Sequence, residues 1–391
     1  MEANKIAIIT VAYNRVDSLK RLLGTLENAY YGDEHPTLII SIDKSNTDVV
    51  ESFADEYSWP HGDKIVRKHE ANMGLRNHMM SLGEWFDKFD TLVVLEDDIV
   101  VSPNFYTYTR QASDKYIGNM KIAGISLYSF GMNYQSRMPF TPQKNEYDVY
   151  FMKCAMSWGE VWMKPQWEEF YQWYLSHQDF PLVPHLPECI CGWKKSWLKY
   201  HTRFCIEEDR YFIHPYTAVS TNYGDAGTHN NGAKSSLFQV VLQDGKKQQY
   251  LLPENPGEAI RYDGFFENES LYDKLQLSES EVCLDICGMK HNRQNRRYWL
   301  TTEIKDFKIV RSFALSCRPI EMNVIKDISG SDIFLYDTQV IEKNKRKANN
   351  SVLLYYSYQS DAISFNSRYG WSRLFKDITN NLFKRITRHG H

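Results

Sequence analysis

Three long apolar runs in the first hundred residues constrain the fold more than any other feature. They are KIAIITVAYNR, TLIISID and TLVVLEDD, and segments with helical spacing such as DSLKRLLGTLENA and NTDVVESFADEY separate them. A continuous apolar run that ends in polar residues is typical of a strand buried on both faces of a parallel sheet. The alternation predicts an α/β fold, a mostly parallel sheet with helices on both faces. Such sheets bind ligands beyond the carboxyl ends of their strands.

The remainder of the chain departs from this alternation. A chain of 391 residues is longer than one core usually needs, because single cores stop growing at roughly 250–300 residues. We expect one domain at 1–254, with halves at about 1–145 and 146–254, and a smaller β-rich C-terminal extension at 255–368. Strand-like runs in the extension are DFKIVRSFALS, DIFLYDTQVI and SVLLYYSY.

The last segment, 369–391, predicts a basic amphipathic helix with an apolar stripe from Trp371 to Ile386. Two interpretations stay open for this helix. It either lies on the inner face of an anionic plasma membrane as a peripheral contact, or packs on the protein's own core or a second subunit.

Charge, cysteine content and hydropathy exclude several classes of protein. The formal net charge of -3 gives no basic field, so no nucleic-acid partner is expected. Seven cysteines without paired zinc-site spacing indicate reduced thiols. The chain shows no apolar run of about 18 residues and no signal-peptide pattern, which predicts a cytoplasmic protein.

The acidic triplet Glu96, Asp97 and Asp98 closes the third apolar run. Buried carboxylates need a counter-charge, and a hard divalent ion that also binds diphosphate oxygens would supply it. The alternative is that the three acids only mark the strand end and face water.

Several motifs together resemble a known superfamily. AYNR, SID, NMGLR and VVLEDDIVVSPNFYTY, followed by CAMSWGEVWMKPQWEEF and TNYGDAGTH, are similar in order and spacing to nucleotide-diphospho-sugar transferases of the GT-A fold. Within that Rossmann-like fold they resemble bacterial polysaccharide glycosyltransferases and the N-acetylglucosaminyltransferase I group. The resemblance covers roughly residues 5–235. It implies metal-dependent transfer of a sugar, typically from a UDP-sugar, to a hydroxyl of a saccharide or lipid-linked acceptor. Capsule and O-antigen synthesis are typical settings.

The resemblance also implies roles for individual residues on the donor side. Arg15 would contact the donor diphosphate, and Asp43 would accept a hydrogen bond from the base. Asp98 would bind Mn²⁺ or Mg²⁺, while Glu96 and Asp97 would contact ribose, sugar hydroxyls or metal-bound water. The other candidates are Asn72 and Arg76 in the nucleotide pocket, Trp158 beneath the donor sugar, and His229 as a late metal or diphosphate ligand. For Trp158 a core position, and for His229 a surface position, are the plain alternatives.

The sequence departs from the pattern at the general base that an inverting transfer requires. Related enzymes carry an acid where GWKKSWLKY places Lys194, and a protonated lysine is a poor base. We therefore predict the base among Glu207, Glu208 and Asp209, with Glu188 or Glu160 next in order; the remaining alternative is a retaining mechanism.

Two other functions remain to be weighed. A sugar nucleotidyltransferase would need a Gly-rich basic signature after the first strand, and AYNRVDSLKRLL does not supply one. A non-catalytic protein that binds carbohydrate or nucleotide-sugar is consistent with the lysine in GWKKSW, but it leaves Arg15, Asp43 and Asp98 without a use.

Overall fold

The computed structural model describes residues 4–136, 138–225, 238–290, 292–346 and 349–357. Within them lies a nine-stranded sheet in the order β13-β9-β11-β6-β10-β4-β1-β2-β3. Its strands are β1 Ile6–Ala12, β2 Thr37–Ile42, β3 Lys64–Lys68, β4 Thr91–Glu96, β6 Ile122–Ser126, β9 Val149–Met152, β10 Glu160–Met163, β11 Tyr211–Pro215 and β13 Arg261–Tyr262. Strands β9, β10 and β13 run against the other strands, so the sheet is mostly parallel. The predicted α/β fold class is confirmed.

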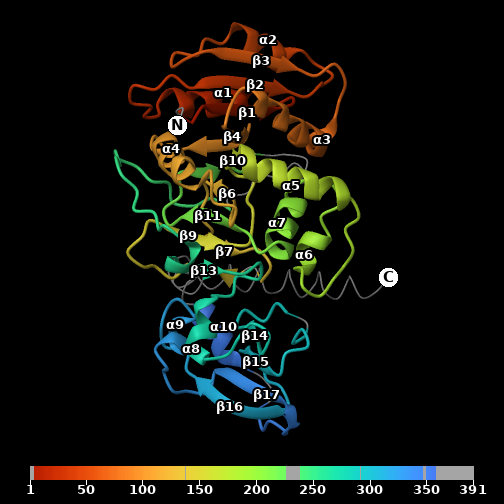
Figure 1. The fold of residues 1–391 in the computed structure, drawn as a ribbon, viewed down its shortest axis with the longest axis vertical. Helices are drawn as coiled ribbons and strands as arrows, with labels where there is room; N and C mark the ends of the chain where they lie inside the picture. The colour runs from red at the N-terminus through yellow and green to blue at the C-terminus, as the bar shows by residue number, and fades with distance from the viewer. Residues whose placement is uncertain (1–3, 137, 226–237, 291, 347–348, 358–391) are drawn as a thin grey trace, which may run out of the picture.

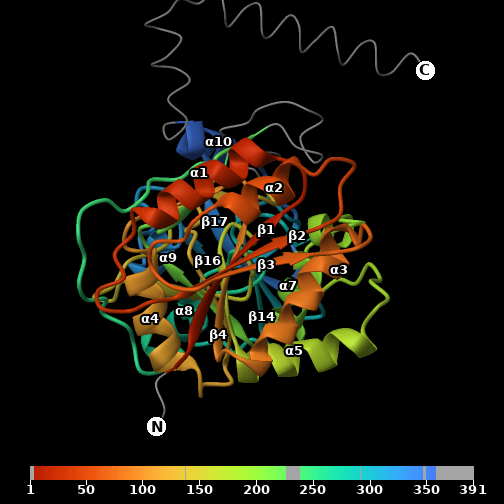
Figure 2. The same cartoon turned by 90° about the horizontal axis from the view of Figure 1, so that it is seen from above.

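Alternate residues of each central strand face two different cores. Ile8 and Leu95 point into the first core, whereas Ile9 and Val94 point into the second. The first core is covered by the helices α1 Val16–Glu27, α2 Val49–Glu56 and α4 Phe105–Tyr116. The second core is covered by α3 Gly74–Ser81, the 3-10 helix η1 Leu82–Asp87, α5 Lys164–Ser176 and α7 Leu198–Glu207. Figure 2 shows α1 and α2 on one side of strands β1 to β3. The continuous apolar runs therefore reflect burial on both faces.

Shorter elements complete the large unit. Strand β5 Ile99–Val101 pairs with β12 Ser220–Asn222, and β7 Met132–Asn133 pairs with β8 Met138–Pro139. The short helices are α6 Glu188–Cys191 and the 3-10 helix η3 Pro256–Glu258. The β5–β12 pair matters for function because it ties a late loop to the residues that follow β4.

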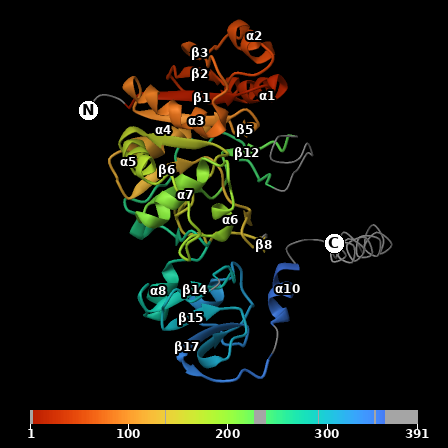
Figure 3. The same ribbon diagram turned by 90° about the vertical axis from the view of Figure 1, so that its right-hand side faces the viewer.

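A second sheet lies beyond the β13 edge of the first, as Figures 1 and 3 show. Its order is β14-β15-β17-β16, with β14 Val282–Asp285, β15 Tyr298–Thr301, β16 Phe307–Phe313 and β17 Ile333–Ile341. Helices α8 Ser270–Leu275 and α9 Met322–Ile325 contribute to its separate core. The expected β-rich extension is confirmed.

One predicted strand in the extension is wrong. The run SVLLYYSY lies mainly in helix α10, Asn350–Ser357. The Tyr355 ring packs 4.2 Å from the Arg318 guanidinium, and its hydroxyl donates to the Cys317 carbonyl at 3.0 Å. The segment thus docks on a loop instead of pairing with a strand, and periodicity cannot separate these outcomes for a short apolar run.

The predicted division into 1–254, 255–368 and 369–391 stays a prediction. Strand β13, which follows the predicted boundary, belongs to the large sheet. The predicted amphipathic helix at 369–391 lies outside the described residues. Within the described part of the chain, no helix is both long and apolar enough to span a membrane.

Candidate active site

Parallel pairing brings the predicted donor residues to one edge of the sheet. Strand β1 pairs with β2 and with β4, and Val11 is in register with Glu96. The carboxyl ends of these three strands therefore meet, and Arg15, Asp43 and the acidic triplet follow them directly. We call this edge, beyond the carboxyl ends of β1, β2 and β4, the donor edge.

Arg15 and two acids of the triplet form an ionic cluster at this edge. The Arg15 guanidinium contacts Asp97 closely, and its Nη1 lies 3.4 Å from Asp98 Oδ2. Burial raises the pKa of Asp97 to about 6, and the positive charge of Arg15 opposes this rise. The Asp98 side chain is more exposed than that of Asp97, at 20% against 4%. Asp98 is therefore the carboxylate of this pair that a ligand can reach.

Glu96 begins the acidic triplet, and its pKa is raised. Burial, followed by the negative charges of Asp98 and Asp97, raises the pKa of Glu96 to about 8. A raised pKa favours the protonated form, in which the carboxyl group carries a hydrogen-bond donor. Such a donor suits the hydroxyl oxygens of a ribose or a sugar.

Asp43 has a structural role that the sequence did not predict. Its Oδ1 accepts hydrogen bonds from the amides of Met73 at 2.8 Å and Lys44 at 2.9 Å, and its Oδ2 accepts one from Gly74 at 3.0 Å. Gly74 has a φ of 71°, which favours glycine. Buried Asp43 thus holds the NMGLR turn against the end of β2. Its predicted contact with the base stays a prediction.

The two other nucleotide-pocket candidates also bind backbone. Asn72 Nδ2 donates to the Lys44 carbonyl at 3.0 Å. Arg76 Nη2 donates to the Lys194 carbonyl at 2.7 Å, which joins the turn to the segment before α7. The backbone of the exposed Lys194 therefore lies within reach of the Arg76 side chain at the NMGLR turn.

The late Gly-rich loop returns to the same edge. The Tyr223 amide donates to the Asp98 carbonyl at 2.8 Å. Asp225 accepts a hydrogen bond from Ser18 Oγ at 2.7 Å and pairs with Arg21, whose guanidinium lies 3.5 Å from the Tyr223 ring centre. Sequence reasoning quoted this loop but missed Asp225. The predicted ligand His229 lies outside the described residues.

On the acceptor side, Trp158 packs as a core residue. Its ring contacts those of Tyr128 and Phe238 at centre distances of 4.9 and 5.0 Å. The next residue, Gly159, has a φ of 100°, and a side chain there would press on Leu127. Trp158 is only partly buried, so its stacking role beneath a sugar stays a prediction.

Glu160 begins β10 at the donor edge and is almost fully buried. It is in register with Val94, two residues before Glu96, and its Oε2 accepts a hydrogen bond from Trp162 Nε1 at 2.7 Å. His201 Nδ1 lies 3.5 Å away. Within the described residues, Glu160 Oε1 and both ring nitrogens of His201 have no hydrogen-bond partner. Buried polar atoms usually have a hydrogen-bond partner, and these three belong to fifteen side-chain atoms without one among the described residues.

The structure places the predicted base cluster at the other edge of the sheet. Glu207, Glu208 and Asp209 end α7 and precede β11, whose first residue pairs with Ile122 at the start of β6. Strand β6 runs parallel to β4, so Asp98 and Asp209 lie at opposite edges, separated by a strand length of roughly 15 Å or more. The arrangement does not bring these acids to the donor edge.

The contacts of this cluster are also structural. Against the effect of burial, hydrogen bonds from Arg203 and His185 hold the pKa of Glu207 below its ordinary value. Lys153 and Lys121, each 2.9 Å from Asp209, lower the pKa of that carboxyl in the same way. A general base at neutral pH needs a raised pKa instead.

A divalent cation at the donor edge, held in part by a diphosphate, stays a prediction. Within the described chain, no group of three or more His, Cys, Asp or Glu side chains is arranged to bind a metal. Asp98 nevertheless offers an accessible carboxylate oxygen, which is a hard ligand, and the acidic triplet outnumbers the single Arg15 that contacts it. Phosphate oxygens usually supply further ligands to such ions.

No model of a protein family matches the chain, and no curated protein matches its sequence. Solved structures are similar to part of it. Staphylococcus aureus TarS 1–349 with UDP-GlcNAc has a TM-score of 0.37 and 12% identity, over 59% of this chain and 62% of that one. A Pyrobaculum calidifontis mannosyltransferase with GDP-Man and Mn²⁺ has a TM-score of 0.34 and 10% identity, over 55% of this chain and 57% of that one. GalNAc-T7 with UDP, GalNAc and Mn²⁺ has a TM-score of 0.39 and 16% identity, over 55% of this chain and 43% of that one.

The matched region covers less than two thirds of each of these three chains. Each of the three structures holds a nucleotide or a nucleotide-sugar.

Proposed function

We propose that this chain is a metal-dependent glycosyltransferase that moves a hexosyl group from a nucleotide-sugar to a hydroxyl acceptor. The observation that carries the proposal is the convergence of Arg15, Asp43 and Asp98 at the carboxyl ends of three parallel strands. These residues come from distant parts of the sequence, and together they offer a cation, a hydrogen-bond acceptor and a metal ligand. We further propose a UDP-sugar donor and a saccharide or lipid-linked acceptor of bacterial surface polysaccharide.

The reaction requires charge stabilisation where the diphosphate leaves. The acceptor oxygen bonds to the anomeric carbon, the bond from that carbon to the phosphate oxygen breaks, and the nucleoside diphosphate gains negative charge. Arg15 lies where its guanidinium can share that charge, and Asp98 would hold the divalent ion. A bound Mn²⁺ or Mg²⁺ would supply Lewis-acid stabilisation to the same oxygens.

For the acceptor proton we propose Glu160 in place of the Glu207 to Asp209 cluster. Glu160 lies at the donor edge, and its Oε1 has no hydrogen-bond partner within the described chain. The residue is buried, so the acceptor hydroxyl must reach Oε1 from the donor edge. A base at this position is consistent with an inverting transfer.

The donor assignment is tested by calorimetry with UDP in the presence and absence of Mn²⁺. Asp98→Asn should abolish the Mn²⁺-dependent part of the affinity while the melting temperature without ligand stays unchanged. Asp87→Asn is a matched control, because Asp87 is exposed and precedes β4 at the opposite edge. Equal metal-dependent UDP affinity in the wild type and Asp98→Asn would refute the assignment.

A catalytically altered nucleotide-sugar-binding protein is the second candidate, favoured by the exposed Lys194, which stands where related enzymes carry an acid. The two functions differ in turnover. Release of UDP from UDP-sugars, with and without saccharide acceptors, supports the enzyme if it depends on Glu160. Tight UDP-sugar binding without turnover supports the binding protein.

A further inference from the structure

A cavity of about 460 Å³ lies between the large sheet unit and the C-terminal unit. Its walls include Lys153 and Glu207, which lie at the edge opposite the donor edge, and Asp263, Tyr272, Lys290 and Gln294 from the chain that follows. The volume lies within the range of small-molecule sites, roughly 300–1,000 Å³. The donor residues Arg15, Asp43 and Asp98 do not line it.

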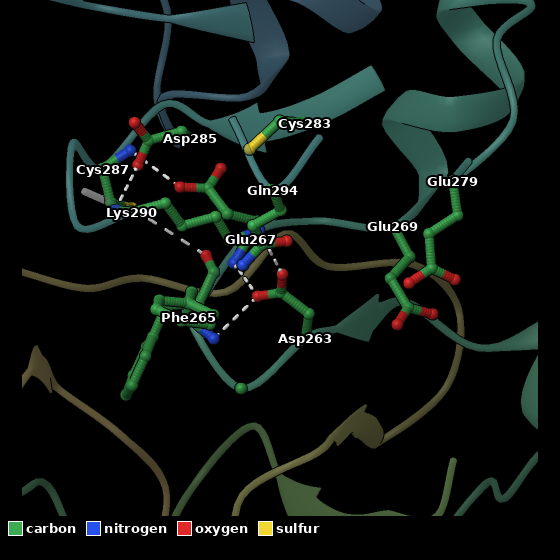
Figure 4. A network of polar contacts seen from close by, with 12 residues as sticks. Asp263, Phe265, Glu267, Glu269, Glu279, Cys283, Asp285, Cys287, Lys290 and Gln294 are labelled. Carbon is green, nitrogen blue, oxygen red and sulfur yellow. Dashed lines mark hydrogen bonds and ion pairs between the residues drawn. The ribbon is translucent and has the colours of Figure 1, made fainter. Parts of the chain in front are cut away.

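Ionic groups in the cavity wall neutralise one another. Lys290 Nζ lies 2.8 Å from Asp263, and Lys153 Nζ lies 2.9 Å from Glu269. Figure 4 shows Lys290 joined to Asp263 beside Gln294. His185 is paired with Glu207 at 3.1 Å, and Arg296 with Glu279 at 3.8 Å. Since Lys153, Lys290 and Arg296 each have an anionic partner, a charged ligand would have to break an existing pair to bind here.

The same wall places polar groups beside aromatic rings. Gln294 Oε1 accepts from Arg296 Nη1 at 3.1 Å, and its Nε2 donates to the Pro184 carbonyl at 3.2 Å, so its amide spans both units. Phe265 and Tyr272 provide the aromatic part of the lining, and Lys290 Nζ lies 4.9 Å from the Phe265 ring centre. Neutral hydrogen-bonding groups beside rings suit a polyhydroxylated, partly apolar ligand, whose hydroxyls would exchange with the bonds of the Gln294 amide.

Backbone geometry around the cavity is unusual. Gln294 and Asn295 have φ values of 53° and 63°, and Phe266, next to the lining residue Phe265, has 67°. Non-glycine residues with such φ values are strained, and they occur preferentially at ligand and active sites. Gly264 has no room for a side chain, because a Cβ would overlap Ile206.

We propose that this cavity binds a neutral oligosaccharide, as a subsite remote from the donor edge. Neutral charge, mixed polarity and ring faces together favour a saccharide over a phosphate or an apolar ligand. Binding itself needs no donor chemistry. Only the further step, that the saccharide is a distal part of the acceptor, rests on the proposed function.

The experiment uses the full chain and defined probes. Maltotriose, cellotriose, mannotriose and N,N′-diacetylchitobiose are titrated by calorimetry and saturation-transfer NMR, with 3′-sialyllactose as an anionic probe of similar size. We expect at least one neutral probe to bind with a Kd of millimolar or lower, and 3′-sialyllactose to bind at least tenfold more weakly.

Variants locate the bound probe. Gln294→Asn keeps a residue that tolerates the positive φ but shortens the amide, and it should weaken binding at least fivefold, as should Arg296→Gln. Gln339→Asn, an exposed matched change on β17, should have no effect. Asp98→Asn should leave saccharide binding unchanged.

Three results would overturn the proposal. They are no binding by any neutral probe, preferential binding of 3′-sialyllactose, or binding of a neutral probe that both cavity variants leave unchanged. The Mn²⁺-dependent UDP titration is a separate measurement, so failure of this proposal is distinguishable from failure of the proposed glycosyltransferase.

Discussion

Replacing Glu267 with glutamine should make the protein less sensitive to alkaline pH. Glu267 is 2% exposed, and its Oε1 accepts a hydrogen bond from the Cys287 amide at 2.8 Å. Burial raises the pKa of this carboxyl to about 8; the positive charge of Lys290 opposes the rise, and the nearby Asp263 and Asp285 add to it. At neutral pH the native protein therefore holds a proton that the unfolded chain releases.

The sign and size of the effect follow from proton linkage. Between the ordinary pKa of 4.5 and the native value near 8, the native state binds more protons than the unfolded state. The free energy of unfolding therefore falls as pH rises, by about 1.4 kcal/mol per pH unit. From pH 6 to pH 8 this group alone removes roughly 2–3 kcal/mol. A glutamine keeps the oxygen that accepts from Cys287 but has no proton to lose.

Urea unfolding at pH 6, 7 and 8, followed by tryptophan fluorescence, measures this difference. We expect the stability of Glu267→Gln relative to wild type to increase between pH 6 and pH 8 by the amount just given. Glu342→Gln, an exposed change of the same charge, should follow the wild type. Asp285 has a raised pKa of about 6, so most of its own contribution falls below this window. Parallel pH dependences of the wild type and Glu267→Gln would refute the reasoning.

Three further predictions test the donor edge and its surroundings. Asp43→Ala should lower the free energy of unfolding by about 1–3 kcal/mol in urea titrations, because the amides of the NMGLR turn lose their acceptor. Calorimetry should show a similar loss of UDP affinity. Unchanged stability would contradict the assigned contacts. Gly159→Ala should lower the free energy of unfolding by roughly 1–3 kcal/mol in the same assay, because of the positive φ and the close Leu127. Gly118→Ala, with open space around it, should lower it by less than about 1 kcal/mol. Asp209→Asn should keep turnover within about twofold, whereas Glu160→Gln should lower it by about 10²–10⁴-fold with donor affinity nearly unchanged; the reverse result would restore the base cluster predicted from the sequence.

The meeting of Arg15, Asp43 and the acidic triplet at one edge of the sheet was predictable, because these residues follow buried strands directly. An apolar run marks a strand, the polar residue after it marks the strand end, and parallel pairing brings such ends together. Arg15, Asp43 and Asp98 were identified in this way. Their contacts were not predictable, since nothing local shows that Asp43 accepts hydrogen bonds from amides thirty residues later in the chain, at Met73 and Gly74.

The base prediction among Glu207, Glu208 and Asp209 stays a prediction, but their place in the fold could not be foreseen, because sequence order says nothing about the direction of a helix. Glu207, Glu208 and Asp209 follow the segment that contains Lys194, but α7 runs back along the sheet and carries these residues away from Asp98. Glu160 is brought to the donor edge by the reversed direction of β10, which no local pattern reveals.

The sequence by itself determined the α/β class, the strands of the donor half and the residues at their ends, because burial on both faces and strand termination are local properties of a chain. Only the tertiary structure decided which acids share an edge of the sheet and which carboxyl groups are buried with a raised pKa. It also decided where a cavity opens between the two units. These properties depend on distances between residues far apart in sequence, and such distances are set by the directions in which strands and helices pack.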